Sequence, residues 1–253
     1  MFLRLVGYFS IAMMLMPMLV QAGVEIVPLQ TNVVDSEKEA TLTVENKDVK
    51  AILVQVWATP HEIVGDHGEK VPLVFSPPLF KLDPGATQKV RVIYLGGPVV
   101  DQKLYRLDVQ EVPQVPEKGG AVVQFAFRHI LPLTISNKRM TREAMEDAEK
   151  SLKWSMGGGN LKLENPTPFV FVIDQITIGE SKIKLDENNQ FTVSAHSSRV
   201  IKAADVQGKI PRASGNEVKF RWFNDMHVPV DAVSEYSVLN DVEAGASEDG
   251  RVR

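Results

Sequence analysis

The sequence predicts an all-β protein that contains two β-sandwich domains. From Gly23 onward, short segments rich in β-branched and apolar residues alternate with turn signals at a spacing of about 8–12 residues. A charged stretch at 137–150 interrupts this series, and a second series of similar segments follows it. The 253 residues of the chain are enough for two domains of ordinary size.

The first series gives the clearest strand patterns. The segment 40–45 alternates fully and stops at Asn46-Lys47-Asp48, and the segment 88–95 also alternates. Asp83-Pro84-Gly85 is a turn, because proline presets φ and glycine accepts a positive φ. The strands expected in this series lie at 24–34, 40–45, 51–58, 76–82, 88–95, 104–112 and 121–135.

The second series predicts a smaller sandwich. Between the two series, Thr141 is an N-cap candidate for one or two helical turns. The strands expected in the second series lie at 152–156, 161–164, 169–178, 182–185, 191–193, 199–203 and 218–223. The predicted divisions are a first domain at 23–137, a connector at 138–150, a second domain at 151–235 and an acidic flexible tail at 236–253, which has little apolar surface to bury.

The first 22 residues have the pattern of a secretory signal peptide. Arg4 is their only charged side chain, an apolar run follows at 5–20, and Val20-Gln21-Ala22 resembles a signal-peptidase site. We therefore expect cleavage after Ala22 and a periplasmic protein. An uncleaved membrane anchor is the alternative, but the run is shorter than the roughly 20 residues of a transmembrane helix. No later segment is apolar enough to span a bilayer, so we expect no membrane insertion of the mature chain.

Composition and spacing argue against several classes of function. The formal net charge of −4 offers no basic face for nucleic acid. The absence of cysteine excludes a cysteine nucleophile and a cysteine metal site. His61 and His67 flank a turn without a third ligand at a supporting spacing, so we expect no metal and no cofactor. No nucleophile-elbow motif is present, and we expect no enzymatic activity.

Four blocks of the chain carry a family resemblance. They are SPPLFKLDPG at 76–85, YRLDVQEVP at 105–113, NPTPF at 165–169 and FND at 223–225. In this order, behind a signal peptide, they resemble the periplasmic chaperones of the chaperone–usher pathway of pilus assembly, over residues 23–230. The stretch RHILPL at 128–133 is further similar to the archaic branch of that family.

The resemblance implies two immunoglobulin-like β-sandwich domains in an L-shaped arrangement. It also implies a chaperone that binds pilus or fimbrial subunits by donor-strand complementation and delivers them to an outer-membrane usher. The alternative is a non-enzymatic immunoglobulin-like structural or binding protein of the cell envelope with a non-pilus client. An exposed donor edge also leaves open a self-capping dimer of the free protein.

The donor strand is expected at 121–128. Because alternate residues of a strand share a face, Val123, Phe125 and Phe127 project together, and Ala121 extends the row. Periodicity alone equally permits a row that faces the protein's own core. The family resemblance favours insertion into a groove of the subunit.

The resemblance also implies an anchor for the carboxylate at the subunit's C-terminus. The family's two basic anchor residues fall on Gln30 and Pro132, and neither is charged. Arg128 shares a strand face with position 132, and we interpret it as a substitute anchor, because a guanidinium binds a carboxylate bidentately. A solvated surface arginine is the alternative. A family arginine that pairs with an aspartate of the second domain falls on Ser136, so we expect Asp225 to lack its usual interdomain partner.

Overall fold

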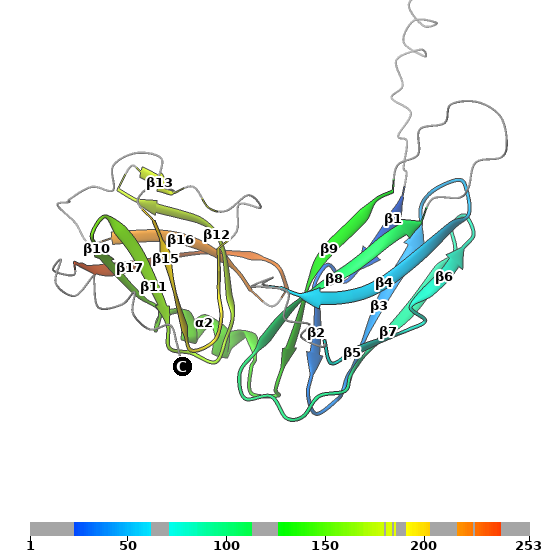
Figure 1. The fold of residues 1–253 in the computed structure, drawn as a ribbon, viewed down its shortest axis with the longest axis horizontal. Helices are drawn as coiled ribbons and strands as arrows, with labels where there is room; N and C mark the ends of the chain where they lie inside the picture. The colour runs from blue at the N-terminus through cyan, green and yellow to red at the C-terminus, as the bar shows by residue number, and fades with distance from the viewer. Residues whose placement is uncertain are drawn as a thin grey trace, which may run out of the picture.

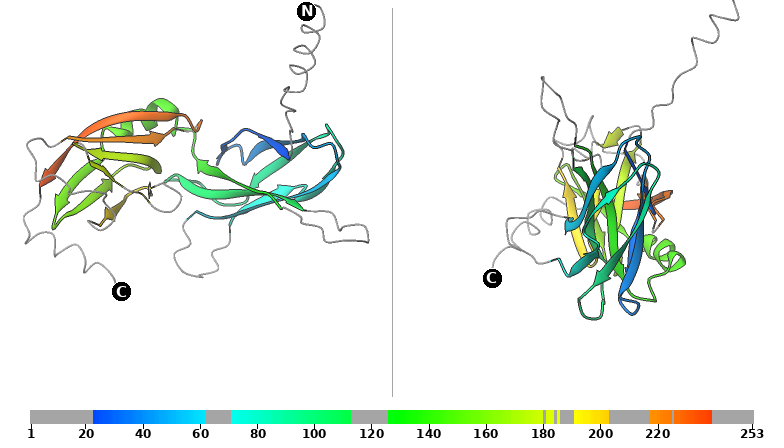
Figure 2. Two further views of the ribbon diagram at one scale, coloured as in Figure 1. Left: turned by 90° about the horizontal axis from the view of Figure 1, so that it is seen from above. Right: turned by 90° about the vertical axis from the view of Figure 1, so that its right-hand side faces the viewer.

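The computed structural model describes residues 23–61, 71–112, 126–179, 181–183, 185, 191–202, 217–224 and 226–238. It contains two β-sandwiches, each with its own apolar core, which confirms the predicted fold class. Figure 1 shows the two sandwiches joined at a bend. The two views in Figure 2 show that they meet only at their adjoining ends.

The first sandwich packs a four-stranded sheet against a five-stranded sheet. The four-stranded sheet has the order β1 (Val24–Val27), β3 (Glu39–Asn46), β7 (Thr87–Tyr94) and β5 (Leu73–Ser76). The five-stranded sheet has the order β2 (Thr31–Val34), β9 (Arg128–Ser136), β8 (Lys103–Val112), β4 (Ile52–Pro60) and β6 (Leu79–Leu82). Alternate residues of these strands, including Leu42, Val90 and Leu107, are fully buried between the sheets.

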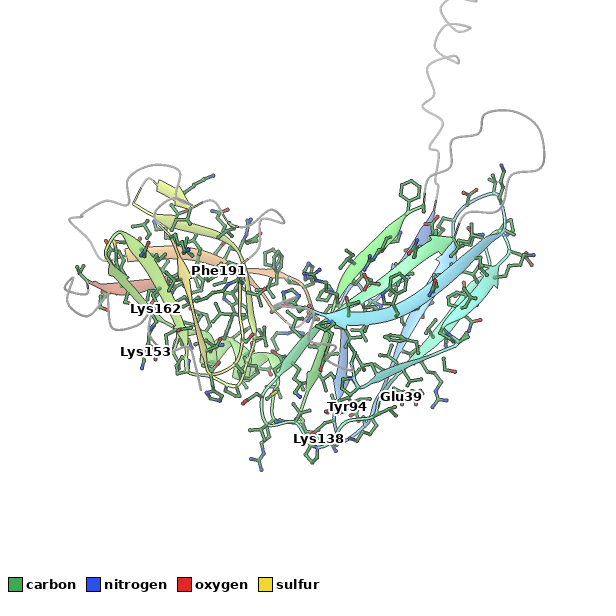
Figure 3. All side chains as sticks on the ribbon, viewed as in Figure 1. Glu39, Tyr94, Lys138, Lys153, Lys162 and Phe191 are labelled. Carbon is green, nitrogen blue, oxygen red and sulfur yellow. The ribbon has the colours of Figure 1, made fainter. Side chains whose placement is uncertain are left out.

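The second sandwich is built on one long strand that belongs to both of its sheets. Strand β17 (Pro229–Val238) pairs antiparallel with β16 and then, from Tyr236 onward, parallel with β10. The other strands are β10 (Lys153–Gly157), β11 (Asn160–Asn165), β12 (Phe171–Ile178), β13 (Ser181–Ile183), β14 (Phe191–Val193), β15 (Ser197–Ile201) and β16 (Glu217–Phe223). Figure 3 shows Lys153 and Lys162 on the outside of this sandwich, while Phe191 belongs to its core.

A short helix, α2 (Arg142–Glu149), connects the two sandwiches. The hydroxyl of Thr141 accepts a hydrogen bond from the amide of Ala144 at 3.3 Å, which confirms the predicted N-cap. Met145 is buried against the core of the second sandwich, so the helix packs on that domain. No helix in the described part of the chain is long and apolar enough to cross a membrane.

The prediction of the acidic tail is wrong at its beginning. Residues 236–238 belong to strand β17, which was not among the expected strands. Tyr236 is only 3% exposed and pairs with Trp154 of β10, so the segment has more to bury than its composition indicates. The charged residues Asp231 and Glu235 lie on the exposed face of the same strand. They give the segment an acidic composition, so its alternation of buried and exposed residues was not recognised in the sequence. Residues 239–253 lie outside the described part of the chain.

Candidate functional site

Strand β9 has a free edge over its first half. On one side it pairs with β8 from Arg128 to Ile135. On the other side β2 pairs with it only from Leu133 to Ser136. Among the residues that the structure describes, no strand pairs with 128–132 on this second side. This stretch, the free edge, therefore presents backbone groups that another chain can pair with.

Phe127 is the one member of the predicted apolar row that lies within the described residues. Leu133 and Ile135 of the same strand face are fully buried, whereas Phe127 is 54% exposed. The amide of Glu111 donates to the carbonyl of Phe127 at 2.9 Å, so the pairing with β8 reaches back to this residue. The exposed ring is what a groove-inserting row requires. The other predicted members, Ala121, Val123 and Phe125, lie outside the described residues.

A cleft of about 840 Å³ lies between the two domains, beside the free edge. Arg106, Ile130 and Pro132 line it from the first domain. Arg199 and His227 line it from the second. The same strand thus supplies both an edge for pairing and one wall of a concave site, which suits the end of an extended polypeptide.

The two positions at which the family carries basic residues both line this cleft. They are Gln30 and Pro132, and the structure thus brings them together without a charge. Arg106 lies directly opposite Pro132 in the antiparallel register of β8 and β9, and it also lines the cleft. It is half-buried, and none of the described residues forms a hydrogen bond or ion pair with its guanidinium group. Arg106 therefore supplies an uncommitted cation beside the expected anchor position.

Arg128, the predicted substitute anchor, has a partner within the first domain. Its Nε donates to Oδ1 of Asp108 at 2.8 Å, and its guanidinium lies 5.0 Å from the ring centre of Trp57. The Asp108 side chain is fully buried and also accepts a hydrogen bond from the Thr59 hydroxyl at 3.1 Å. The charge of Arg128 therefore compensates a buried carboxylate, and Arg128 is not among the residues that line the cleft.

Gln102 holds the two domains together at the end of the cleft. Its backbone amide donates to the carbonyl of Pro168 at 2.8 Å, and its side-chain Oε1 accepts from the backbone amide of Val170 at 3.0 Å. Only 7% of its surface is exposed. Two histidine contacts also cross the junction, His61 to Thr192 at 2.8 Å and His196 to Asp101 at 3.2 Å.

The predicted interdomain aspartate, Asp225, lies outside the described residues. Ser136, at the position of the family's arginine, is buried and donates to Oδ1 of Asn32 within its own domain at 2.9 Å. Asn224 accepts hydrogen bonds from the amides of Met226 and Val228 and shapes the turn before β17. The expectation that Asp225 lacks a partner stays a prediction.

The Asn-Pro-Thr-Pro motif has a structural role, as its residue types indicate. The side-chain amide of Asn165 donates to the carbonyls of Phe169 at 2.6 Å and Ser194 at 2.9 Å. Its Oδ1 accepts from both the amide and the hydroxyl of Thr167. The buried asparagine thereby fixes the entry to β12 on the wall of the second domain.

His227 lines the cleft and has a lowered pKa. Burial lowers the pKa of its imidazole, and the charge of Asp174 opposes this only in part. The ring stacks on Phe223 with centroids 4.4 Å apart. Within the described part of the chain, no three histidine, cysteine, aspartate or glutamate residues gather as metal ligands.

Comparison with known families identifies the family to which this two-domain architecture belongs. The family model for the N-terminal domain of PapD, the pili and flagellar-assembly chaperone, matches residues 23–139. The model for the C-terminal domain of the pili assembly chaperone PapD matches residues 147–228. The chain belongs to the family of pilus assembly chaperones. The family resemblance read from the four sequence blocks is thus confirmed.

Individual members of this chaperone family are distant relatives. The probable fimbrial chaperone LpfB of Escherichia coli O157:H7 is 29% identical over 154 residues, which cover 59% of this chain and 64% of that protein. The chaperone protein LpfB of Salmonella typhimurium is 27% identical over 205 residues, which cover 79% of this chain and 83% of that protein.

A solved structure shares the fold of the chaperone. The Salmonella enterica SafB chaperone, in complex with the SafA pilin, superposes with a TM-score of 0.66 at 23% identity. The match covers 85% of this chain and 97% of that chain. At this level of identity the likeness shows the two-sandwich fold.

Proposed function

We propose that this chain is a periplasmic chaperone that binds pilus or fimbrial subunits by donor-strand complementation and delivers them to an outer-membrane usher. One observation carries the proposal: the Phe127 ring is exposed beside a free strand edge. A strand with these two properties can complete an incomplete sandwich of another protein. Membership of the pilus assembly chaperone family supports the same function.

Donor-strand binding divides the work between backbone and side chains. The free edge at 128–132 would pair with a strand of the subunit, and the row Ala121, Val123, Phe125 and Phe127 would enter its groove. Full burial of each large member contributes about 1.5–3 kcal/mol. The family match and the signal-peptide pattern support export to the periplasm, with cleavage after Ala22.

We further propose that Arg106 holds the carboxylate at the end of the subunit. It is the cation beside Pro132, it lines the cleft, and its guanidinium group has no partner among the described residues. Arg128 was the candidate from the sequence, but its guanidinium is engaged by Asp108. A charge-assisted hydrogen bond contributes about 1.5–3 kcal/mol, so one such anchor can set the register of the bound strand.

The remaining expectations complete the proposal. The domain limits stay at 23–137 and 151–235, with the second extended through Val238 of β17. The chain would act without a cofactor and without catalysis, because its proposed work is binding. A self-capping dimer through the free edge is a state that subunit binding would replace.

The decisive experiment is capture of candidate subunits in the periplasm. The wild-type chain should co-purify with a pilus subunit, and the paired variant Phe125→Asp, Phe127→Asp should lose about tenfold or more of it, because burying a lone carboxylate is costly. The matched control is Val49→Asp, Leu79→Asp, which charges two apolar residues that are 84% and 53% exposed elsewhere on the same domain. Circular dichroism must show that both variants are folded.

The outcomes separate the candidate functions. Equal capture by all three proteins would reject the apolar row as the binding element. A partner that is not a pilus subunit, but is lost with the charged pair, would favour the alternative of an envelope protein with a non-pilus client.

A further inference from the structure

The first described residue, Gly23, lies against the carboxylate of Glu111, which forms no ion pair with a lysine or arginine among the described residues. The amide of Val24 donates to Oε1 of Glu111 at 3.1 Å, and the carbonyl of Gly23 accepts from the amide of Lys47 at 3.0 Å. These two hydrogen bonds fix the chain at the beginning of β1. The side chain of Glu111 is only 13% exposed.

The surroundings of the Glu111 carboxylate favour a positive charge beside it. Its only ion-pair contact among the described residues is with Nε2 of His129, at 3.7 Å. That nitrogen has no hydrogen-bond partner there. A carboxylate that is largely buried without a cation is costly, so the site is incomplete as it stands. Lys47, which directly follows β3, directs its ammonium to Glu25 and Glu45 instead.

A positive charge on the nitrogen of Gly23 would lie within reach of the Glu111 carboxylate. A Cβ added to Gly23 would lie 2.9 Å from Oε1 of Glu111. Because the nitrogen of Gly23 is bonded to the same Cα, it lies roughly 2.5 Å from that Cβ position. A charge on this nitrogen would therefore face Glu111 at ion-pair range after a small rotation. The φ of +101° at Gly23 also makes this backbone unfavourable for any residue with a side chain.

We infer that removal of the signal peptide between Ala22 and Gly23 creates an ammonium group that forms an ion pair with Glu111. The inference rests on the proposed export to the periplasm. A signal peptidase would hydrolyse the bond with one water molecule: the hydroxyl joins the carbonyl carbon of Ala22, and the hydrogen joins the nitrogen of Gly23, which takes up a further proton at neutral pH.

The ion pair would stabilise the base of the donor strand. Glu111 is the residue whose amide donates to the carbonyl of Phe127, the described member of the predicted apolar row. Fastening the new N-terminus to Glu111 ties β1, β8 and the start of β9 together at this point. Before processing, the nitrogen of Gly23 is an uncharged peptide amide and Glu111 lacks this partner. The first domain would thus reach its full stability only after export.

A one-residue change in the start of the chain isolates the ion pair. The chain has no cysteine, so it can be made in the cytoplasm with Met before Gly23 or before Ala22, and aminopeptidase removes that Met in both cases. The two products differ by one alanine, which moves the ammonium away from Glu111. Each is made with and without Glu111→Gln. Intact mass confirms each start, and also the start of the protein secreted from the full precursor.

The expected result is a coupling between the two changes. Adding Ala22 should lower the melting temperature of the first domain by on the order of 3 °C when Glu111 is present, and should have little effect in the Glu111→Gln protein. Glu39→Gln, at the opposite end of β3, is the matched control and should leave the effect of Ala22 unchanged (Figure 3). Gly23→Ala should also lower the melting temperature, because the added Cβ meets Oε1 of Glu111.

The pH dependence separates the ion pair from simple crowding by Ala22. The ion pair would raise the pKa of the amine in the folded state above its ordinary value of about 7.7–8.0. The stabilisation should therefore be complete at about pH 7 and disappear as the pH rises toward about 10. The other charged groups nearby, His129, Lys47, Glu25 and Glu45, are the same in all four proteins, so their contributions cancel in the cycle.

Two outcomes would overturn the inference. One is additive effects of Ala22 and Glu111→Gln at neutral pH. The other is a secreted protein whose mass shows a start other than Gly23. Neither measurement contains a subunit, so failure here leaves the proposed chaperone function standing, and loss of subunit capture leaves the ion pair standing.

Discussion

Arg106 and Pro132 lie directly opposite each other across the antiparallel pair β8 and β9, and both line the cleft between the domains. Directly opposed residues in such a pair have Cβ atoms about 4.5–5.5 Å apart. A guanidinium on β8 can therefore occupy much of the space that a basic side chain at position 132 would use. In the proposed anchor, the cation thus lies on the strand next to position 132, in the same wall of the cleft.

Replacing Arg106 should weaken the binding of a subunit through its terminal carboxylate. For Arg106→Gln we expect about 10- to 100-fold weaker binding of a peptide that copies the subunit's last strand, because a charge-assisted hydrogen bond is lost. Fluorescence anisotropy with a labelled peptide would measure this. The same peptide with a C-terminal amide should bind wild type as weakly as the acid binds Arg106→Gln.

Arg128→Gln is the matched comparison for this prediction. Its charge is committed to Asp108, so the preference of the chaperone for the acid over the amide should persist. If that preference vanished in Arg128→Gln and survived in Arg106→Gln, the anchor would be Arg128, as the sequence first suggested.

The Arg128–Asp108 pair should matter for stability in an asymmetric way. Arg128→Gln leaves a fully buried carboxylate without its cation, and we expect a loss of about 3 kcal/mol in the first domain. Asp108→Asn leaves an arginine that is 45% exposed and can be hydrated, so it should cost only about 1 kcal/mol. Urea unfolding followed by the fluorescence of Trp57, which contacts Arg128, would measure both.

The double variant tests whether the cost comes from the stranded charge. Combining Arg128→Gln with Asp108→Asn should restore most of the stability lost in Arg128→Gln alone. Losses that simply add would show that packing of the arginine on Trp57, rather than charge compensation, dominates.

The sequence was sufficient for most of the fold because its strands alternate. Each segment with a clear period of two, such as 40–45 and 88–95, became a strand within one or two residues of its expected limits. Strand β17 was missed because its inward residues are small or polar, apart from Val230 and Tyr236, and its outward residues include charges. The partner that buries Tyr236 is β10, some 80 residues away in the chain, and local pattern does not contain that information.

The exposure of Phe127 agrees with its predicted place in the apolar row, whereas the electrostatic surroundings of the free edge were not predictable from the sequence. Alternation identified Phe127 as part of an apolar row, and the structure then found it exposed. Arg106 has no distinguishing neighbour in sequence, and only the β8–β9 register relates it to Pro132. Aligning β8 and β9 as an antiparallel pair, residue by residue from their paired ends, would have placed Arg106 opposite Pro132. Arg128 is engaged in an ion pair because the carboxylate of Asp108 is buried. Strand parity alone places Asp108 on the outward face of its sheet, so the sequence does not indicate this burial.

Gln102→Ala should loosen the junction between the domains. It leaves the backbone contact to Pro168 intact but removes the acceptor for the buried amide of Val170. An unsatisfied buried amide costs about 1–3 kcal/mol, so we expect a broader range of interdomain angles and weaker subunit binding. Small-angle X-ray scattering would show a larger radius of gyration. Gln88→Ala, which changes a half-buried glutamine near the start of β7 in the first domain, is the control, and an equal change in both variants would contradict the role of Gln102.

His227 should make the second domain sensitive to acid. Burial lowers the pKa of its imidazole in the folded state below the ordinary value of about 6.5 that applies in the unfolded state. Above about pH 6.5 both states are neutral and stability is unaffected; as the pH falls below this value the unfolded state binds the proton more readily, and stability declines until the folded pKa is reached. The second domain should therefore lose stability as the pH falls below about 6.5.

His227→Asn should flatten this pH profile while lowering stability at every pH. The lower stability follows from loss of the stacking on Phe223, and asparagine suits the φ of +58° at this position. Urea unfolding followed by Trp154 and Trp222, both in the core of the second domain, would give the profile. An unchanged slope in His227→Asn would assign the acid sensitivity to another group.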